Sequence, residues 1–152
     1  MKFEGTVPIQ APIEKVWSGL TDPNLVSQCA PGLQSMTIVV PDKQFNVVAS
    51  IGFGAVKVTF NVDIAFAEKN PPSHASVKAH GKAPGSGVDI TSEMNLAADN
   101  PDHTTLTWTA DVAVVGSIAG LANRLMGGLT KSLSTQFFNC IKAKIEEAKI
   151  AA

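Results

Sequence analysis

The sequence is short of the side chains that most enzyme and metal chemistry uses. It contains no tyrosine and only two cysteines, and charged residues make up 16% of its 152 positions, compared with about 25% in a typical soluble domain. Cys29 and Cys140 form neither a CxxC motif nor another metal-ligand spacing, so the sequence predicts no metal site. A disulfide between them stays open as an alternative, but we expect free thiols in a reducing cytoplasm.

Long apolar runs and excess charge are also absent. No window approaches the ~18 uninterrupted apolar residues of a membrane-spanning helix, and the N-terminal stretch MKFEGTVPIQ has no signal-peptide core. The net charge is -1 and there is no basic patch, which argues against a nucleic-acid partner. We therefore expect a soluble, cytoplasmic protein with one domain over residues 1–149 and a short C-terminal tail at 150–152.

Alternating apolar and polar residues predict about seven strands. The first is Lys2–Gln10, where Pro8 favours a position at a sheet edge. The other six are expected at Leu33–Val40, Gln44–Gly52, Val56–Phe66, His74–Lys82, Val88–Leu96 and Thr104–Val115. The connecting turns are short and rich in Pro, Gly, Asn and Asp, which indicates antiparallel hairpins. One face of nearly every strand is apolar, so one face of the sheet must be covered.

Helical periodicity supplies that cover. Two short helices are expected after the first strand, one opening at Ala11–Glu14 and one at Asn24–Gln28 with Asp22 or Asn24 as its cap. Between Gly116 and Ala148 apolar residues recur at three- and four-residue steps, which predicts one long amphipathic helix. The sequence thus predicts an α+β helix-grip fold, in which a curved antiparallel sheet of about seven strands surrounds a long C-terminal helix.

The inward face of this sheet mixes bulky and small side chains. Small residues such as Ala49, Ala79 and Ala110 leave room for a hydrophobic cavity, or else large helix residues such as Phe137 fill that room. Alternation alone does not decide between these two interpretations. If a cavity exists, its candidate lining residues are Phe45, Val58, Phe60, Val77, Met94, Trp108, Leu121, Leu125 and Leu129.

The inward positions include no Asp, Glu, His, Lys or Arg, and Ser92 is the only hydroxyl there that resembles a nucleophile. Acid–base catalysis needs a titratable group that faces the substrate. The alternation instead places His74, His80, Asp63, Glu93 and Asp111 on the outer face and His103 in a turn. We therefore predict no catalytic residue, no cofactor and no metal.

The first half of the long helix has two unusual features. Gly127-Gly128 lies inside the helix, where each glycine costs about 1 kcal/mol relative to alanine. A close approach of helix and sheet backbones is the favoured explanation, and a hinge is the alternative. Arg124 either reaches solvent or binds a polar head group, and we include it among the candidate ligand contacts. Any cavity entrance is expected near Gly52–Gly54 and Pro84–Gly87.

Three segments resemble a known family. They are GTVPIQAPIEKVWSGLTDP at Gly5–Pro23, CAPG at Cys29–Gly32 and VGSIAGLANRLM at Val115–Met126. They are similar to the CoxG family of carbon monoxide dehydrogenase subunits, within the START/Bet v 1-like (SRPBCC) superfamily. The resemblance covers essentially the whole chain, and it implies a helix-grip fold with a deep hydrophobic cavity. It also implies a role beside molybdenum-containing carbon monoxide dehydrogenases and handling of a lipophilic quinone.

Our functional hypothesis follows from this resemblance and from the apolar inward face. We expect a non-enzymatic carrier of a hydrophobic ligand, a quinone or another lipid, that serves a carbon monoxide dehydrogenase-type molybdenum hydroxylase. A polyketide cyclase-like enzyme and a structural or assembly factor for the dehydrogenase are the alternatives. Many members of the family carry a C-terminal membrane-anchoring helix, but this chain ends at Ala152. We therefore expect membrane contact to be at most peripheral.

Overall fold

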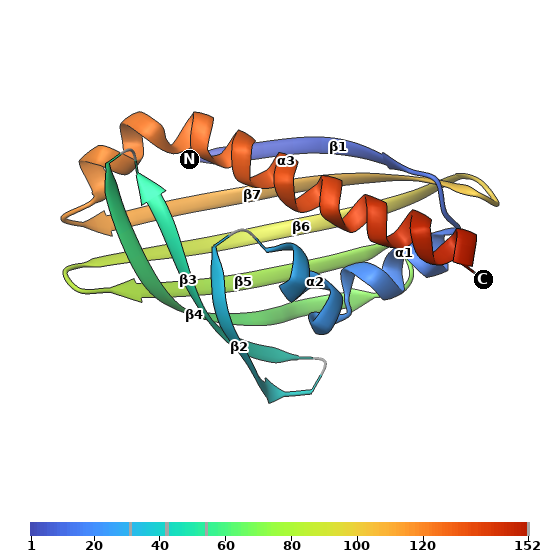
Figure 1. The fold of residues 1–152 in the computed structure, drawn as a ribbon, viewed down its shortest axis with the longest axis horizontal. Coiled ribbons are helices and arrows are strands. Elements are labelled where there is room, and N and C mark those ends of the chain that lie inside the picture. The colour runs from blue at the N-terminus through green and yellow to red at the C-terminus, as the bar shows by residue number, and fades with distance from the viewer. Residues whose placement is uncertain (31, 42, 54, 152) are drawn as a thin grey trace.

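Strands make up the middle of the chain, between two short helices near its N-terminus and one long helix at its C-terminus (Figure 1). The computed structural model describes residues 1–30, 32–41, 43–53 and 55–151, with Phe53, Met126 and residues 147–151 described in their backbone alone. The elements are β1 (Lys2–Ile9), α1 (Ile13–Leu20), α2 (Pro23–Cys29), β2 (Leu33–Val40), β3 (Gln44–Phe53), β4 (Val56–Asn70), β5 (His74–Ala83), β6 (Ser86–Asn100), β7 (His103–Gly116) and α3 (Ala119–Ala151).

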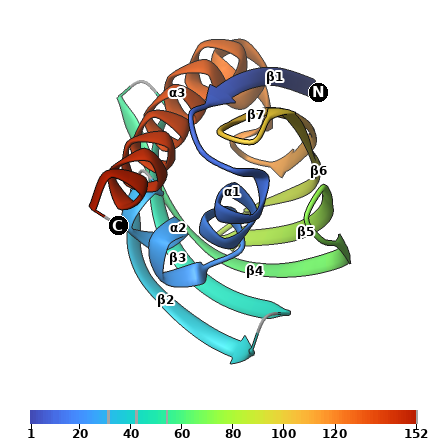
Figure 2. The same cartoon turned by 90° about the vertical axis from the view of Figure 1, so that its right-hand side faces the viewer.

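The seven strands form one antiparallel sheet in the order β1-β7-β6-β5-β4-β3-β2. Successive hairpins join β2 through β7, and β1 adds to the far side of β7 as an edge strand, where Pro8 lies opposite Thr105. The sheet curves into a trough, α3 lies along its open side, and α1 and α2 close one end (Figures 1 and 2). The predicted α+β helix-grip fold is confirmed, and β4 and β6 run several residues past their predicted ends.

Local signals fix the short helices and the start of the long one. Asp22 caps α2, because its carboxylate accepts a hydrogen bond from the backbone N–H of Asn24 at 3.0 Å. Gly116, between β7 and α3, adopts a φ of +93°, and a Cβ there would lie 2.1 Å from the carbonyl oxygen of Gly85. Only glycine fits this position. The backbone N–H of Ser117 donates to that same carbonyl at 2.9 Å, which ties the start of α3 to the β5–β6 turn.

The tightest core lies where α3 meets α1 and the end of β1. Ile9, Val16, Leu106 and Ile141, from four different elements, have no exposed surface. Thr104 is equally buried and satisfies its hydroxyl by donating to the carbonyl oxygen of Ala11 at 2.8 Å. The second half of α3 is therefore anchored in a closely packed core.

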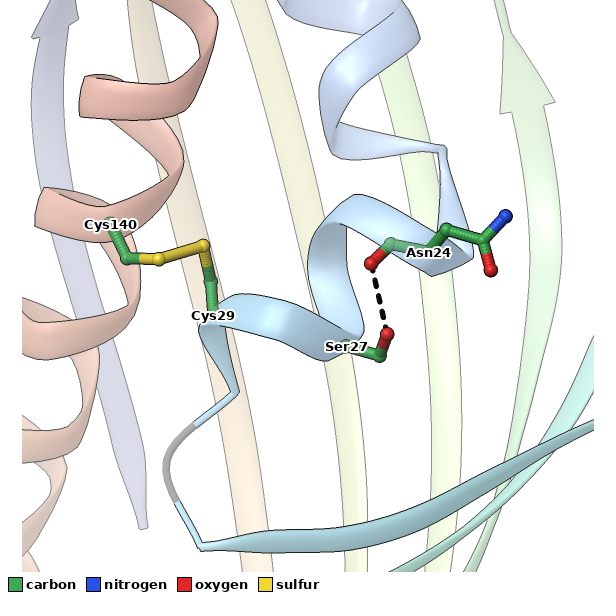
Figure 3. Close-up of a disulfide and its surroundings, with 4 residues drawn as sticks. All are labelled: Asn24, Ser27, Cys29 and Cys140. Carbon is green, nitrogen blue, oxygen red and sulfur yellow. Dashed lines mark hydrogen bonds between the residues drawn. A yellow bond between two sulfur atoms is a disulfide. The ribbon is translucent and has the colours of Figure 1, made fainter.

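The prediction of free thiols is wrong. Cys29, the last residue of α2, forms a disulfide with Cys140 of α3, with the two Cα atoms 5.4 Å apart (Figure 3). The two cysteines are separated by 111 residues in sequence, so their pairing depends on how α2 packs against α3 rather than on any spacing along the chain.

The structure also addresses the membrane and the predicted tail. Within the described residues, no helix combines the length and the hydropathy needed to cross a bilayer. The predicted tail at 150–152 overlaps α3, which continues to Ala151, and residue 152 lies outside the described residues.

Candidate ligand-binding site

Two apolar cavities lie between the concave face of the sheet and the helices. The first, which we call the α3 chamber, has a volume of about 400 Å³ and lies beneath the middle of α3, against Phe60, Val112 and Leu129. The second, the α2 chamber, has a volume of about 390 Å³ and lies against Val26 of α2 and Phe45 of β3. Volumes of this size are typical of small-molecule sites.

Aromatic side chains divide the two chambers. Trp108 of β7 stacks on Phe138 of α3 with ring centroids 5.7 Å apart, and Phe137 meets Phe138 edge-on at 5.1 Å. These three rings line both chambers, together with Ala30 and Ala49. The two chambers therefore share a wall of aromatic side chains.

The chamber walls carry few side chains that could take part in catalysis. Among the described residues that line either chamber, none is Asp, Glu, His, Lys or Arg. The hydroxyl of Ser92 donates to the backbone carbonyl of Thr109 at 2.8 Å, so its proton is directed at a carbonyl oxygen and not at a base. Thr21, Ser27 and Ser134 also donate to backbone carbonyls of their own helices. The described walls can hold an apolar ligand, but they present no acid–base or nucleophilic pair.

Six of the ten predicted contacts line the chambers. Phe45, Val77 and Met94 line the α2 chamber, Phe60 and Leu129 line the α3 chamber, and Trp108 lines both. Whether they contact a ligand remains a prediction.

The other four predicted residues do not line either chamber. Val58 and Leu121 pack against the buried cluster of Phe60, Val112 and Ala122 instead, which fills the space beneath the first turns of α3. Arg124 and Leu125 are exposed, Leu125 by 36%. Ala122, three residues before Leu125, has no exposed surface, so Leu125 lies at the solvent side of the buried stripe.

The favoured explanation of Gly127-Gly128 is also wrong. A Cβ added at either glycine would meet no described atom within 4 Å, so the sheet backbone does not approach the helix there. The predicted entrance near Gly52–Gly54 and Pro84–Gly87 stays a prediction, and Gly54 lies outside the described residues.

Sequence reasoning missed the wall that α1 and α2 provide and the aromatic ring of Phe138. Leu20 and Val26 line the α2 chamber, but helical periodicity indicates at most that such a residue is buried and does not indicate that it lines a cavity. Phe138 could have been predicted as a lining residue, because it directly follows Phe137. Adjacent helix residues are about 100° apart, so two large neighbouring side chains can both reach the chambers.

Titratable groups lie on the outer surface and in turns, as predicted. His80 contacts Asp89 and His74 contacts Glu93, all with substantial exposure. In the β6–β7 turn the hydroxyl of Thr105 donates to the Asp99 carboxylate, and this hydrogen bond, followed by one from His103, lowers the pKa of Asp99. No group of three or more potential metal ligands occurs in the described part of the chain.

Solved structures with this fold cover nearly the whole chain. A conserved protein from Geobacillus kaustophilus matches with a TM-score of 0.89 and 28% identity over 97% of both chains. The Zhui aromatase/cyclase from a Streptomyces species matches with a TM-score of 0.75 and 18% identity, over 96% of this chain and 93% of that one. A START superfamily protein from Mycobacterium smegmatis gives a TM-score of 0.72 and 16% identity, over 97% and 98% of the two chains.

Sequence comparison narrows the relationship. A search of curated proteins gives no match. The family described as a carbon monoxide dehydrogenase subunit (CoxG) matches residues 5–146, which include the two short helices, the whole sheet apart from the first residues of β1, and most of α3. The chain therefore has a START/Bet v 1-like fold and belongs to the CoxG family.

Proposed function

We propose that this protein is a non-enzymatic carrier of a hydrophobic ligand, a quinone or another lipid, held in the chambers between sheet and helices. The observation that carries the proposal is the chemistry of their walls, which are apolar and contain no titratable side chain among the described lining residues. A ligand that leaves water for such walls gains about 0.8 kcal/mol for each buried methylene. Long isoprenoid or acyl chains are therefore the favoured class.

The proposed partner is a carbon monoxide dehydrogenase-type molybdenum hydroxylase. Membership of the CoxG family supports this choice, since the family is described as a subunit of carbon monoxide dehydrogenase. In this role the protein would carry its ligand to or from the enzyme.

A cyclase-like enzyme is less well supported. The aromatase/cyclase with the same fold is only 18% identical, so that likeness concerns the fold alone. An enzyme of that kind would need a polar or ionisable side chain directed into the cavity, and the described chamber walls lack an ionisable one. A purely structural role would predict a filled core, and the two chambers argue against it.

Extraction and titration test the proposal. The purified protein is extracted with organic solvent and the extract is analysed by mass spectrometry. Menaquinone is then titrated into a Trp17→Phe variant, so that Trp108, in the wall between the chambers, is the sole fluorophore of its kind. We expect a co-purifying lipid or saturable quenching of Trp108. If neither is found, the protein is not a carrier of this class.

A further inference from the structure

A third cavity, a groove, lies between the edge strand β1 and the long helix α3. Its volume is about 430 Å³, and residues 3–8 of β1 form one wall. The opposite wall is a single face of α3, because its residues recur at three- and four-residue steps from Gly127 to Lys142. This face is about 22 Å long. Its polar members are Thr130, Lys131, Ser134, Thr135, Asn139 and Lys142.

The groove and the apolar chambers meet at shared side chains. Thr130, Ser134, Phe138 and Trp108 line both the groove and the α3 chamber. The indole of Trp108 lies against Gly5 of β1, where an added Cβ would be 2.6 Å from its Nε1 atom and 2.8 Å from its Cε2 atom. Glycine at this position lets the indole reach the edge of the sheet. The boundary between groove and chamber is thus one layer of side chains thick.

Hydrogen-bond donors dominate the groove and its boundary. The Nε1–H of Trp108 has no hydrogen-bond partner within the described part of the chain and is not sealed from solvent, so it can donate to a ligand. The hydroxyl of Thr130 is a second donor at the boundary. Lys131 adds an ammonium group, as does Lys142, which lies 3.8 Å from Glu146. Glu4 is the one carboxylate among the described lining residues. A donor-rich surface of this kind is complementary to oxygen acceptors.

We propose that the β1–α3 groove holds the polar end of the ligand, an oxygen-rich head with carbonyl or carboxylate acceptors, whose apolar part lies in the chambers. The inference rests on the proposed carrier function, and it assigns that carrier an amphipathic ligand with a hydrogen-bond-accepting head. It also moves the head-group site away from Arg124, which is exposed and does not line the groove.

Three fluorescent probes with different ends test this assignment. They are cis-parinaric acid with an anionic carboxylate, its methyl ester with a neutral carbonyl acceptor, and diphenylhexatriene with no head group. Affinities are measured for the wild type, for Thr130→Val and for the double variant Lys131→Met, Lys142→Met. Lys144→Met is the matched control, since Lys144 is also on α3 but does not line the groove.

Loss of a groove donor should weaken binding of the probes with acceptor heads by about three- to tenfold. Thr130→Val should affect acid and ester alike, while the lysine double variant should affect the acid. A double variant that also weakens the ester would assign the site a neutral carbonyl head as well. Diphenylhexatriene should bind all variants equally, and Lys144→Met should leave all three affinities unchanged.

Fatty acids that carry a doxyl quencher near the carboxylate or near the methyl end locate the head directly. In the Trp17→Phe variant, quenching of Trp108 should be stronger with the quencher near the carboxylate. Equal or reversed quenching would overturn the head-group assignment, as would groove variants that bind every probe like the wild type. In those cases the carrier function would stand if diphenylhexatriene still binds. Failure of all three probes to bind the wild type would instead overturn both proposals.

Discussion

Ala110 of β7 shows how one small residue sets the room available to a ligand. Its methyl group faces the α3 chamber, and an indole at this position would occupy much of that space. Ala110→Trp should weaken binding of an apolar ligand by at least about tenfold, since each methylene that loses its buried place costs about 0.8 kcal/mol. The measurement is a titration with menaquinone or diphenylhexatriene.

Ala113→Trp is the matched control for this substitution. Ala113 is on the same strand but is exposed, so an indole there should leave the affinity unchanged. Equal affinities of the Ala110→Trp variant and the wild type would show that the ligand lies outside the α3 chamber.

Asp99 offers a residue-scale prediction that depends on pH. Its pKa is lowered first by the hydrogen bond from Thr105 and then by His103. A carboxyl whose pKa is lower in the folded state stabilises the fold above its unfolded pKa, and this contribution is lost as pH falls through the folded value. Thr105→Val should therefore raise the Asp99 pKa toward its ordinary value, as measured by NMR titration of the carboxyl carbon. An unchanged pKa would assign the shift to His103 instead.

The disulfide is the covalent link between two elements, α2 and α3. A disulfide typically stabilises a fold by about 2–4 kcal/mol, mainly because it constrains the unfolded chain. The Cys29→Ser, Cys140→Ser double variant should lose that much free energy of unfolding in urea titrations. Dithiothreitol should lower the stability of the wild type to the same level and leave the variant unchanged. A wild type that does not respond to dithiothreitol would indicate that the two thiols are unpaired in solution.

Gly128 allows a second test of the stability of α3, one that leaves the disulfide unchanged. An added Cβ would meet no described atom within 4 Å, and alanine is favoured over glycine inside a helix by about 0.5–1 kcal/mol. Gly128→Ala should therefore raise the midpoint of thermal unfolding. If the glycine serves as a hinge, the same variant should also slow ligand association in stopped-flow measurements. A destabilised variant would mean that the helix must depart from regular geometry there.

Periodicity was sufficient to predict each element but not the contacts between elements. Alternation from Val56 onward predicts a strand because every second side chain must leave water, which is a local property of the chain. The Cys29–Cys140 pair and the open surroundings of Gly127 depend on how α2 and α3 pack, and no local pattern records that packing. The positions of Trp108 and Leu129 in the chamber wall were predicted. The exposure of Leu125 was not, because it depends on how α3 is rotated about its axis when it packs on the sheet.

At the scale of the whole molecule, the two ends of α3 are held very differently. Near its C-terminal end Ile141 has no exposed surface, Ile145 is 3% exposed and Cys140 is covalently fixed. In the first half Asn123, Arg124 and Leu125 are exposed, and Ala122 is the one fully buried side chain among the described residues there. Buried contacts raise the free energy of local opening, so the first half of α3 is the part expected to open.

Hydrogen exchange can measure this asymmetry. In the ligand-free protein the amides of residues 123–129 should exchange faster than those of residues 137–145, because fewer buried side chains oppose their opening. A ligand in the α3 chamber would contact Leu129 and Leu133 and should slow exchange most strongly around these residues, since the segment that contains Ile141 and Ile145 is already anchored. Uniform exchange along α3, or equal slowing of both halves on ligand addition, would contradict a helix with one fixed and one mobile end.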